Sequence, residues 1–484
     1  MGIRYFNFNV AIHTGVLNII IKELLVKILF HSYTTGSLFI KGEKMFTKAI
    51  VIGGSIAGKL AAKALSNTFE EVIIVEAGEE WDGKGPRKRV PQSNHPHVLL
   101  KGGEEALEEL FPNITNELIE AGSIVNNFTR DLKWHQFGLW KQPFKGEINM
   151  IQQSRLLLES HIQKRIEQVS NVTSKYEMLV EGLLVDNKLN KVYGIRAKCL
   201  KTGMKEEFHA DLVVDASGFG SKSIDWLQEY NFEVQEEKVR IDLFYATRMF
   251  RLKEKEKLDC CNMLMSPSFP ENPYGVLIQT IEDDRYFVTF SGYANEKAPQ
   301  TDDEFYDFAE NLSITNVTEF LNKSEAITDI KTYKIPYQVR RRFDLVNNLP
   351  EGLLVVGDAH CRFDPVFGQG VSVAAMEAHQ LQLILQGRKR LDKILTREFY
   401  RKTAMIIKTP WEMTTTEIAR HPKLQKELTT KQKFQQWYTK QIYQLSASDS
   451  DIYIRLVRVM NLIRSPFHLF HPRVLLTVLL RRKK

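Results

Sequence analysis

The chain's organising motif is AIVIGGSIAGKLAAKAL at residues 49–65, followed by EVIIVE at residues 71–76. The pattern predicts a strand, a glycine-rich turn, a helix and a second strand, the parts of a dinucleotide-binding βαβ unit. Gly53 permits the tight turn, Gly58 lets the helix pack closely, and the helix N-terminus offers free N–H groups to a pyrophosphate. Glu76 ends the second strand, where a carboxylate accepts hydrogen bonds from ribose hydroxyls. An ordinary βα turn is disfavoured because all these features occur together at the expected spacing.

One position departs from the glycine-rich fingerprint. Ser55 stands where the middle glycine is expected, so a Cβ atom and a hydroxyl must fit beside the phosphates. Ile56 and Ala57 follow it at the start of the predicted helix, and we expect both to contact the cofactor.

A second motif, PEGLLVVGDAHCRFDPVFGQGVS, occupies residues 350–372 and predicts a buried strand, a loop and a helix from Val371 to Leu385. It resembles the Gly-Asp motif of FAD-dependent oxidoreductases of the p-hydroxybenzoate hydroxylase type. The resemblance implies that the aspartate accepts a hydrogen bond from a ribityl hydroxyl of FAD, and that the backbone after the last glycine meets the flavin pyrimidine. A helix N-terminus suits that place, because a reduced flavin is anionic there. The expected contacts are Asp358, Gly368, Gly370, Val371 and Ser372.

A third motif, DLVVDASGFGS at residues 211–221, is similar to the Asp-Gly motif of the same family in a variant form. Ser217 stands where the family usually has aspartate, and the acid lies two residues earlier at Asp215, an expected cofactor contact. In the family this motif serves both the flavin and the reduced pyridine nucleotide, so the departure leaves direct reduction by NADPH open. A similar Asp-Ala-Ser-Gly form in flavin-dependent geranylgeranyl reductases keeps a reductase as an alternative.

The segment QSRLLL at residues 153–158 begins an amphipathic helix predicted to extend to about Val169. Family members carry an arginine there that contacts FAD, so the resemblance implies the same for Arg155, and Val180 is a further expected contact. The segment RVPQSNHPHVLLKG at residues 89–102 is similar to a signature of one bacterial subgroup, where a mobile loop lies near the flavin. His95 and His97 either face the substrate or brace this loop. Bracing is favoured, because Pro96 stiffens the turn and no metal-ligand spacing accompanies them.

The resemblance extends from Lys48 to about Pro422 and implies an α/β fold. We expect an FAD-binding, Rossmann-like domain of the glutathione-reductase type, a mostly antiparallel sheet that forms a substrate domain, and a helical C-terminus. The predicted FAD-binding domain comprises residues 45–230, interrupted near 130–150 by part of the substrate domain, and returns at residues 341–390. Residues 231–340 form the predicted substrate domain, in which strand-like runs alternate at residues 240–250, 274–280 and 286–291. Residues 391–484 form the helical, basic C-terminal region, which we expect to be interrupted at Pro410-Trp411 and His421-Pro422.

The 484 residues are 43% hydrophobic, enough for two or three cores. The four cysteines, Cys199, Cys260, Cys261 and Cys361, show no disulfide framework, which favours a cytoplasmic location. We expect residues 1–44 to be a non-native or disordered extension, with Met45 as the true start, because Lys41-Gly-Glu-Lys resembles a translated ribosome-binding site. An amphipathic membrane anchor is the alternative.

The net charge of +7 is concentrated near the C-terminus, where residues 452–484 carry several arginines and lysines and no acid. The apolar residues between them predict amphipathic helices. Such helices pack on their own domain or lie on an anionic membrane at its inner face. Packing is favoured, and nucleic acid is disfavoured because no recognised binding module accompanies the charge.

These features predict an FAD-dependent monooxygenase that takes electrons from NAD(P)H, directly or through a partner reductase. The resemblance implies that a C4a-hydroperoxyflavin hydroxylates or epoxidises a small aromatic or isoprenoid-like substrate with molecular oxygen, without a metal or a catalytic side chain. The alternatives are a flavin-dependent reductase or dehydrogenase of a lipid or polyprenyl substrate, and a non-enzymatic flavin-binding protein. A halogenase is disfavoured because the sequence has no Trp-x-Trp-x-Ile-Pro segment.

Overall fold

The computed structural model describes residues 45–481 except 86, 88, 89, 255, 257–261, 425 and 426. The predicted extension 1–44, Arg89, Cys260, Cys261 and the last three residues of the basic tail lie outside the described residues. Strands of the first two sheets are β1 (Phe46–Ile52), β2 (Phe69–Val75), β7 (Val172–Lys175), β11 (Leu212–Asp215), β18 (Leu353–Val355), β8 (Met178–Asp186), β9 (Lys191–Cys199) and β10 (Lys205–His209).

The first sheet has five parallel strands in the order β18-β11-β1-β2-β7. Ile52 at the end of β1 pairs with Val75 of β2 and Asp215 of β11, and Asp215 pairs with Val355 of β18. The carboxyl ends of these four strands therefore meet at one edge, the place where open parallel sheets bind ligands. Strands β8, β9 and β10 form a separate antiparallel sheet.

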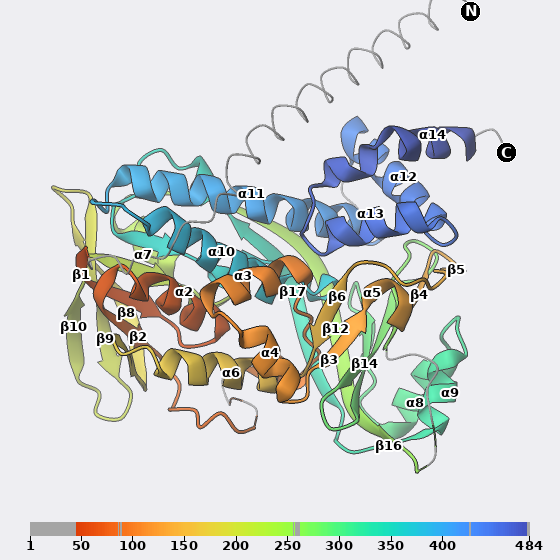
Figure 1. Ribbon diagram of the computed structural model, residues 1–484. Helices are drawn as coiled ribbons and strands as arrows, with labels where there is room; N and C mark the ends of the chain where they lie inside the picture. Colours follow the sequence, from red (N-terminus) through yellow and green to blue (C-terminus); the bar gives the residue numbers. More distant parts are fainter. Residues whose placement is uncertain are drawn as a thin grey trace, which may run out of the picture. The chain divides into compact units, whose positions relative to one another are not determined.

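Helices cover the five-stranded parallel sheet and confirm the predicted α/β class. They include α2 (Ile56–Ser66), α3 (Lys101–Leu110), α4 (Ile114–Glu120), α6 (Arg155–Glu167), α7 (Ser223–Glu229) and α10 (Gly370–Leu385). In Figure 1, α10 lies beside α2 and α3 and beneath α11, and it contacts all three. The largest core fills the space between these helices and the sheet.

The largest sheet has nine strands in the order β19-β17-β12-β15-β14-β13-β4-β5, with β16 paired to β12. All pairings are antiparallel except that of β13 with β4. The strands predicted from the alternating runs coincide with β12, β14 and β15, while β4 and β5 come from the segment near 130–150. The bounds are β4 (Leu132–Gln136), β5 (Leu139–Trp140), β12 (Glu236–Leu252), β13 (Asn262–Met265), β14 (Tyr274–Ile281), β15 (Arg285–Gly292), β16 (Ser324–Ala326), β17 (Lys331–Arg341) and β19 (Cys361–Arg362).

Shorter elements complete this half of the molecule. Strands β3 (Ile124–Asn127) and β6 (Asn149–Gln152) pair with each other, and α5 (Phe128–Asp131) joins β3 to β4. Helices α8 (Asp302–Glu310) and α9 (Asn316–Asn322) share a core with the nine-stranded sheet, at the lower right of Figure 1.

The C-terminal region is helical, with one correction to the prediction. Pro410 and Trp411 were expected to interrupt it, but α11 (Lys393–Ile418) continues through both. Ile407, Pro410 and Trp411 are all buried, so the apolar packing of this face outweighs the local cost of about 3 kcal/mol that a proline imposes on a helix interior. The later helices are α12 (Thr430–Leu445), α13 (Ser450–Met460) and α14 (Pro472–Arg481).

The helices α12, α13 and α14 pack beside α5 and β4 at the right of Figure 1. Ile452, Leu456 and Val457 of α13 are buried there, so this helix packs its apolar face on its own chain. None of the described helices combines the length and hydropathy needed to cross a bilayer.

Candidate functional site

A cavity of about 550 Å³ opens at the carboxyl edge of the parallel sheet and continues beneath the nine-stranded sheet. It is lined by most of the predicted cofactor contacts, namely Gly53, Ser55, Ile56, Ala57, Glu76, Arg155, Val180, Asp358, Gly368, Gly370 and Val371. Gly58, Asp215 and Ser372 are not on its wall. The three sequence motifs, each more than 120 residues from the next along the chain, therefore border a single cavity.

The glycines of the first turn are explained by close backbone approach. Gly53 has φ +97°, and a Cβ added to it would lie 2.7 Å from the Ala216 carbonyl oxygen. A Cβ on Gly58 would lie 1.8 Å from the carbonyl oxygen of Gly53. Gly58 is thus required for packing between helix and turn, as predicted, although it does not face the cavity.

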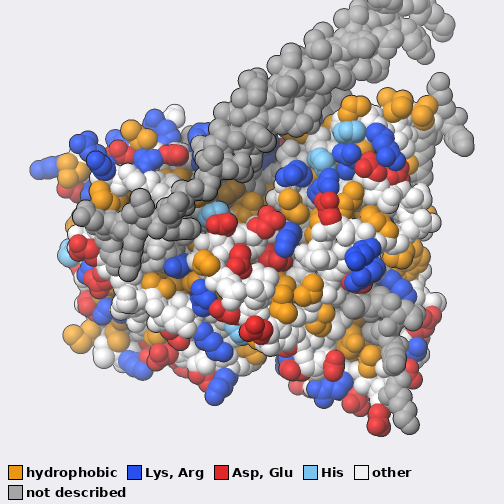
Figure 2. Space-filling view, in the orientation of Figure 1, with side chains coloured by type: hydrophobic (Ala, Val, Ile, Leu, Met, Phe, Trp, Pro, Cys, Tyr) orange, Lys and Arg blue, Asp and Glu red, His pale blue; other side chains and the backbone are white. Residues whose placement is uncertain are grey.

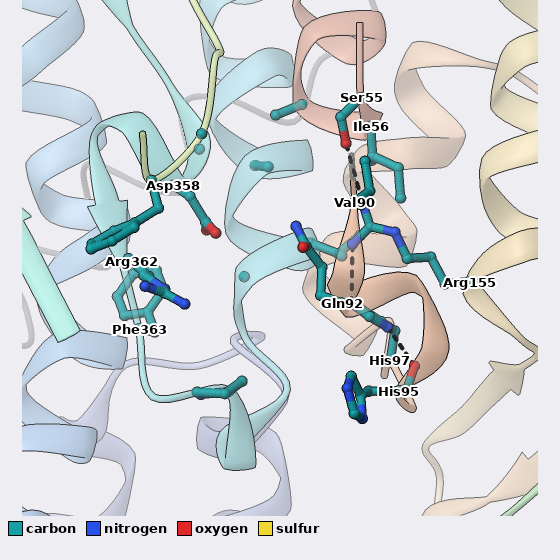
Figure 3. Close-up of a pocket in the computed structure, with 18 of the residues that line it drawn as sticks. Ser55, Ile56, Val90, Gln92, His95, His97, Arg155, Asp358, Arg362 and Phe363 are labelled. Carbon is teal, nitrogen blue, oxygen red and sulfur yellow. Dashed lines mark hydrogen bonds between the residues drawn. The ribbon is translucent and has the colours of Figure 1, made fainter. Parts of the chain in front are cut away.

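Ser55 has a partner that explains its departure from glycine. The Arg155 Nη2 atom donates a hydrogen bond of 3.1 Å to the Ser55 hydroxyl, and the Nη1 atom bonds His97 Nε2 at 3.0 Å. Figure 3 shows the Arg155 guanidinium between these two side chains. The serine therefore fixes the guanidinium next to the N-terminus of α2, where a phosphate binds most readily.

A buried cluster of charges lies behind this guanidinium. Glu159 contacts Lys59, Arg87 and Arg155 at distances of 2.8 to 3.3 Å. Burial raises the pKa of the Glu159 carboxyl, but the three cations outweigh burial and lower it to about 2. Burial also lowers the pKa of Lys59 to about 8. Three cations around one carboxylate make this wall electropositive, as an anionic ligand requires.

Glu76 directly follows β2 and lies against the glycine-rich turn that precedes α2. Its two oxygens accept hydrogen bonds of 2.6 Å from the backbone N–H groups of Gly54 and Gly78, and Arg87 lies 3.3 Å away. These backbone donors hold the carboxylate on the cavity wall with lone pairs left for a ligand. The geometry fits the ribose-binding role expected of Glu76.

Asp358 occupies the other side of the cavity (Figure 3). Among the described residues, none donates a hydrogen bond to its carboxyl group. Burial raises the pKa of Asp358, while the nearby Arg362 and Arg155 lower it. A carboxylate in this setting is costly unless a ligand hydroxyl completes its hydrogen bonds, which is the role that the resemblance implies.

Asp358 is positioned by a residue that the sequence motif did not reveal. Glu377 on α10 is fully buried, and its Oε2 atom accepts a hydrogen bond of 2.7 Å from the Gly357 N–H. Its Oε1 atom lies 2.8 Å from His360 Nδ1. Glu377 thus holds both ends of the Gly357–His360 turn. The sequence signal for Glu377 was a glutamate among the apolar residues of the predicted helix, but the sequence pattern did not indicate which groups it would bind.

The start of α10 also faces the cavity. Gly368 has φ +65°, which permits the turn into the helix. Gln369 is 1% exposed, lines the cavity, and its Oε1 atom has no hydrogen-bond partner in the described structure. Free helical N–H groups and an unsatisfied acceptor together fit a planar ring that carries both donors and acceptors, such as the flavin pyrimidine.

Two residues that were predicted to contact the cofactor, Asp215 and Ser372, form hydrogen bonds within the protein. Asp215 is fully buried and accepts hydrogen bonds from the hydroxyls of Ser217, Ser221 and Ser223, so it orders the loop of the third motif. The Ser372 hydroxyl accepts a hydrogen bond of 2.9 Å from the Leu100 N–H, which joins α10 to the start of α3.

The two histidines of the loop line the cavity and are both braced. His97 Nδ1 donates to the His95 carbonyl oxygen at 2.9 Å, so its Nε2 atom accepts from Arg155. Burial, together with Arg155, lowers the pKa of His97 to about 3. His95 Nδ1 bonds the Thr247 hydroxyl at 2.8 Å, and burial lowers its pKa to about 4. Both rings are therefore neutral at pH 7.

Sequence patterns did not reveal the cavity residues that come from the nine-stranded sheet. Tyr245, Tyr333 and Met265 belong to three different strands and carry no local motif. Cys361 is buried outside the cavity wall, and the described residues include no group of three or more His, Cys, Asp or Glu side chains suited to a metal ion.

Comparison with known proteins places this geometry in context. No protein-family model matches the chain. Protein Rv3254 of Mycobacterium tuberculosis is 29% identical over 376 residues, which cover 75% of this chain and 78% of that protein.

Several solved structures share the fold. A flavoprotein/dehydrogenase from Cytophaga hutchinsonii matches with a TM-score of 0.64 at 16% identity, covering 90% of this chain and 100% of that one. The flavin-dependent brominase Bmp2 matches with a TM-score of 0.62 at 15% identity, covering 86% and 93%. The oxygenase of 2-methyl-3-hydroxypyridine-5-carboxylic acid matches with a TM-score of 0.55 at 16% identity, covering 77% and 90%. The chain therefore has a flavoenzyme fold, while the resemblance to the p-hydroxybenzoate hydroxylase type in particular stays a prediction.

Proposed function

We propose that this protein is an FAD-dependent monooxygenase that hydroxylates or epoxidises a small aromatic or isoprenoid-like substrate, with NAD(P)H as the electron donor. The observation that carries the proposal is the single cavity that begins between the N-termini of α2 and α10 and continues beneath an apolar sheet. Such a cavity has room for a dinucleotide at one end and for a substrate against its reactive ring at the other.

The residues assigned to FAD follow from the contacts described above. The α2 N-terminus, Ser55 and Arg155 bind the pyrophosphate, and Glu76 binds the adenosine ribose. Asp358 accepts a ribityl hydroxyl, and the N–H groups at the start of α10 meet the pyrimidine ring, with the Gln369 side chain as a further acceptor. Val180 contacts the adenine half from the neighbouring sheet.

FAD supplies the redox chemistry, and the chain's own residues bind, orient and exclude water. The dipole of α10, a helix of 16 residues, stabilises negative charge on the pyrimidine edge. The neutral rings of His95 and His97 add no competing charge at the reacting end. No side chain needs to act as a nucleophile.

The test uses protein that has been reconstituted with FAD. We expect NADPH to bleach the oxidised flavin spectrum under anaerobic conditions, and ¹⁸O₂ to label a product formed from a panel of phenols and prenyl alcohols. If dithionite bleaches the flavin spectrum but NADPH does not, even with the panel present, a partner reductase is favoured as the electron donor.

Other outcomes select the alternatives. Substrate-dependent reoxidation without oxygen, with loss of a prenyl double bond, identifies a reductase. An FAD that neither NADPH nor a reductase can reduce identifies a non-enzymatic flavin-binding protein. Unlabelled product from ¹⁸O₂ rules out the monooxygenase.

We also propose that the C-terminus contacts anionic membranes. Val474 and Val478 of α14 are buried, but Phe467, Leu476 and Leu479 are about half exposed, and hydrophobic side chains gather at the upper right of Figure 2 over this region. We expect co-sedimentation with phosphatidylglycerol vesicles and not with phosphatidylcholine vesicles, lost in a Leu476→Glu variant. Equal sedimentation of the variant contradicts the contact.

A further inference from the structure

The end of the cavity beneath the nine-stranded sheet is chemically distinct from the end between α2 and α10. We call it the sheet pocket and define it by Tyr245, Met265, Val276, Thr289, Tyr333 and Ile335. The cavity-lining residues of β12, β13, β14, β15 and β17 are apolar, aromatic, glycine or hydroxyl residues and carry no formal charge, whereas Arg362 of β19 brings a guanidinium into contact with Tyr333. The pocket is therefore suited to an apolar ligand.

His95 supplies a directional polar contact in this pocket. The ring lies 5.8 Å from those of both Tyr245 and Tyr333, centroid to centroid. Its Nδ1 atom is held by Thr247, whose hydroxyl lies 2.8 Å from that of Thr289. No described residue bonds its Nε2 atom. Because the threonine hydroxyls can donate or accept, either ring tautomer is available, and a ligand hydroxyl can satisfy both.

A buried acid lies directly behind the pocket wall. Asp364 is fully buried, while its neighbours Phe363, Pro365 and Val366 line the cavity. Its Oδ1 atom accepts from the Val366 N–H at 3.1 Å, and its Oδ2 atom accepts from the Tyr293 hydroxyl at 2.8 Å. Burial raises the pKa of Asp364 to about 6, so the group is largely ionised above neutral pH. Its charge opposes an anion in the pocket.

The cationic side chains on the cavity wall have partners within the protein. Arg362 faces the cavity, but its Nη2 atom donates to the Tyr333 hydroxyl at 3.1 Å, and its guanidinium lies 4.0 Å from the centroid of the Phe219 ring. Its charge partly offsets the burial that raises the pKa of Asp358. Arg155 and Arg87 pair with Glu159, and Lys222, which also lines the cavity, pairs with Asp225. The positive charge nearest the sheet pocket is therefore that of Arg362, which is shared among the Tyr333 hydroxyl, the Phe219 ring and Asp358.

We infer that the sheet pocket binds an uncharged, apolar substrate whose hydroxyl group is held by His95, and that the buried carboxyl of Asp364 excludes carboxylate analogues. The inference deepens the proposed function, because it names the substrate class of the same site. Its test is a binding measurement that needs no turnover.

The test compares methyl 4-hydroxybenzoate with 4-hydroxybenzoate, which share a ring and a hydroxyl and differ in charge. Each is titrated into the FAD-loaded protein at pH 8, and binding is followed by the visible flavin spectrum and by calorimetry. We expect the ester to bind at least about tenfold more tightly than the anion. Methyl benzoate, which lacks the hydroxyl, should bind several-fold more weakly than the hydroxylated ester.

Substitutions at two residues, His95 and Asp364, separate the two parts of the inference. His95→Phe keeps an aromatic ring and should abolish the preference for the hydroxylated ester, while His95→Gln, which can still donate or accept, should retain part of it. Asp364→Asn keeps the size of the side chain and should narrow the discrimination against 4-hydroxybenzoate. His161→Phe is the matched control, because His161 on α6 is outside the cavity. FAD content and thermal unfolding establish that each variant is folded.

An anion that binds as tightly as the ester, or an ester that does not saturate the protein, overturns the inference. So does a hydroxyl preference that survives in both His95 variants. Selective binding without any oxygen transfer leaves the inference intact and contradicts only the proposed monooxygenase activity.

Discussion

At the scale of single residues, Arg155 links the helix α6 to the glycine-rich turn. Its guanidinium donates to Ser55 and His97 on the cavity wall and pairs with the buried Glu159 behind it. We expect Arg155→Gln to weaken FAD binding by at least about tenfold, because a charged hydrogen bond contributes about 1.5–3 kcal/mol. Fluorescence titration of the apoprotein with FAD measures this.

Arg165→Gln is the matched control for that experiment. Arg165 lies on the same helix but is partly exposed and pairs with Glu117. If both variants bind FAD as well as the parent protein does, Arg155 does not contact the cofactor.

Glu377 is the second residue whose change is informative. Its carboxylate serves two groups, the Gly357 N–H and the His360 ring. In Glu377→Gln only one acceptor oxygen remains, so the amide nitrogen must face one of these groups. We expect a loss of about 1–3 kcal/mol in the free energy of unfolding and a weaker FAD complex. Urea denaturation with and without FAD measures both, and an unchanged midpoint contradicts this role for Glu377.

At the scale of elements, the packing of α3 on α10 depends on one glycine. A Cβ on Gly103 would lie 2.4 Å from the Cα and Cβ atoms of Ser372, so α3 can approach α10 closely only with glycine there. We expect Gly103→Ala to lower the free energy of unfolding by about 1–3 kcal/mol, the usual cost of overpacking.

A glycine with open space around it provides the comparison. A Cβ on Gly182 of β8 would meet nothing within 4 Å, so Gly182→Ala should change the free energy of unfolding by less than about 1 kcal/mol. Chemical denaturation of the two variants tests the difference. Equal destabilisation would falsify the close-packing explanation for Gly103.

At the scale of the whole molecule, Lys141 ties the C-terminal helices to the nine-stranded sheet. It is 5% exposed, lies 4.9 Å from the centroid of the Trp134 ring, and donates to the Tyr443 carbonyl oxygen and, at 2.6 Å, to the Ser446 hydroxyl. Burial lowers its pKa from 10.5 to about 7. Between these values the unfolded chain holds a proton that the folded chain has released.

Stability should therefore rise with pH over this interval, by at most about 1.4 kcal/mol per pH unit. Urea midpoints measured between pH 7 and pH 10 should rise in the parent protein. They should rise less in Lys141→Met, in which the titrating group is gone, whereas Lys145→Met, a change at an exposed residue of the same segment, should keep the parent's slope. Identical slopes in all three proteins contradict the role assigned to Lys141.

Local motifs were sufficient to locate most of the residues that line the proposed cofactor end of the cavity. The glycines of residues 53–58, Glu76 and the Gly357-Asp358 segment could be identified from the sequence because turn geometry and strand ends impose residue types within a few positions. The resemblance to known flavoenzymes also located Arg155. Its hydrogen bond to Ser55, 100 residues away, was not predictable, because it depends on how α6 packs against α2.

What the sequence determined by itself was the α/β class, the glycine-rich turn, the Gly-Asp segment and the helices that begin near Arg155 and Val371, since periodicity and turn chemistry are local properties. What only the tertiary structure decided was the sheet pocket, the burial of Asp364 behind it and the positioning roles of Glu377 and Lys141. These depend on strands and helices brought together from distant parts of the chain, and burial changes the chemistry of a carboxyl or an ammonium group without leaving a local pattern. Pro410 is a further example of what only the tertiary structure decides. A proline by itself predicts the end of a helix, but buried contacts stabilise α11 on both sides of it.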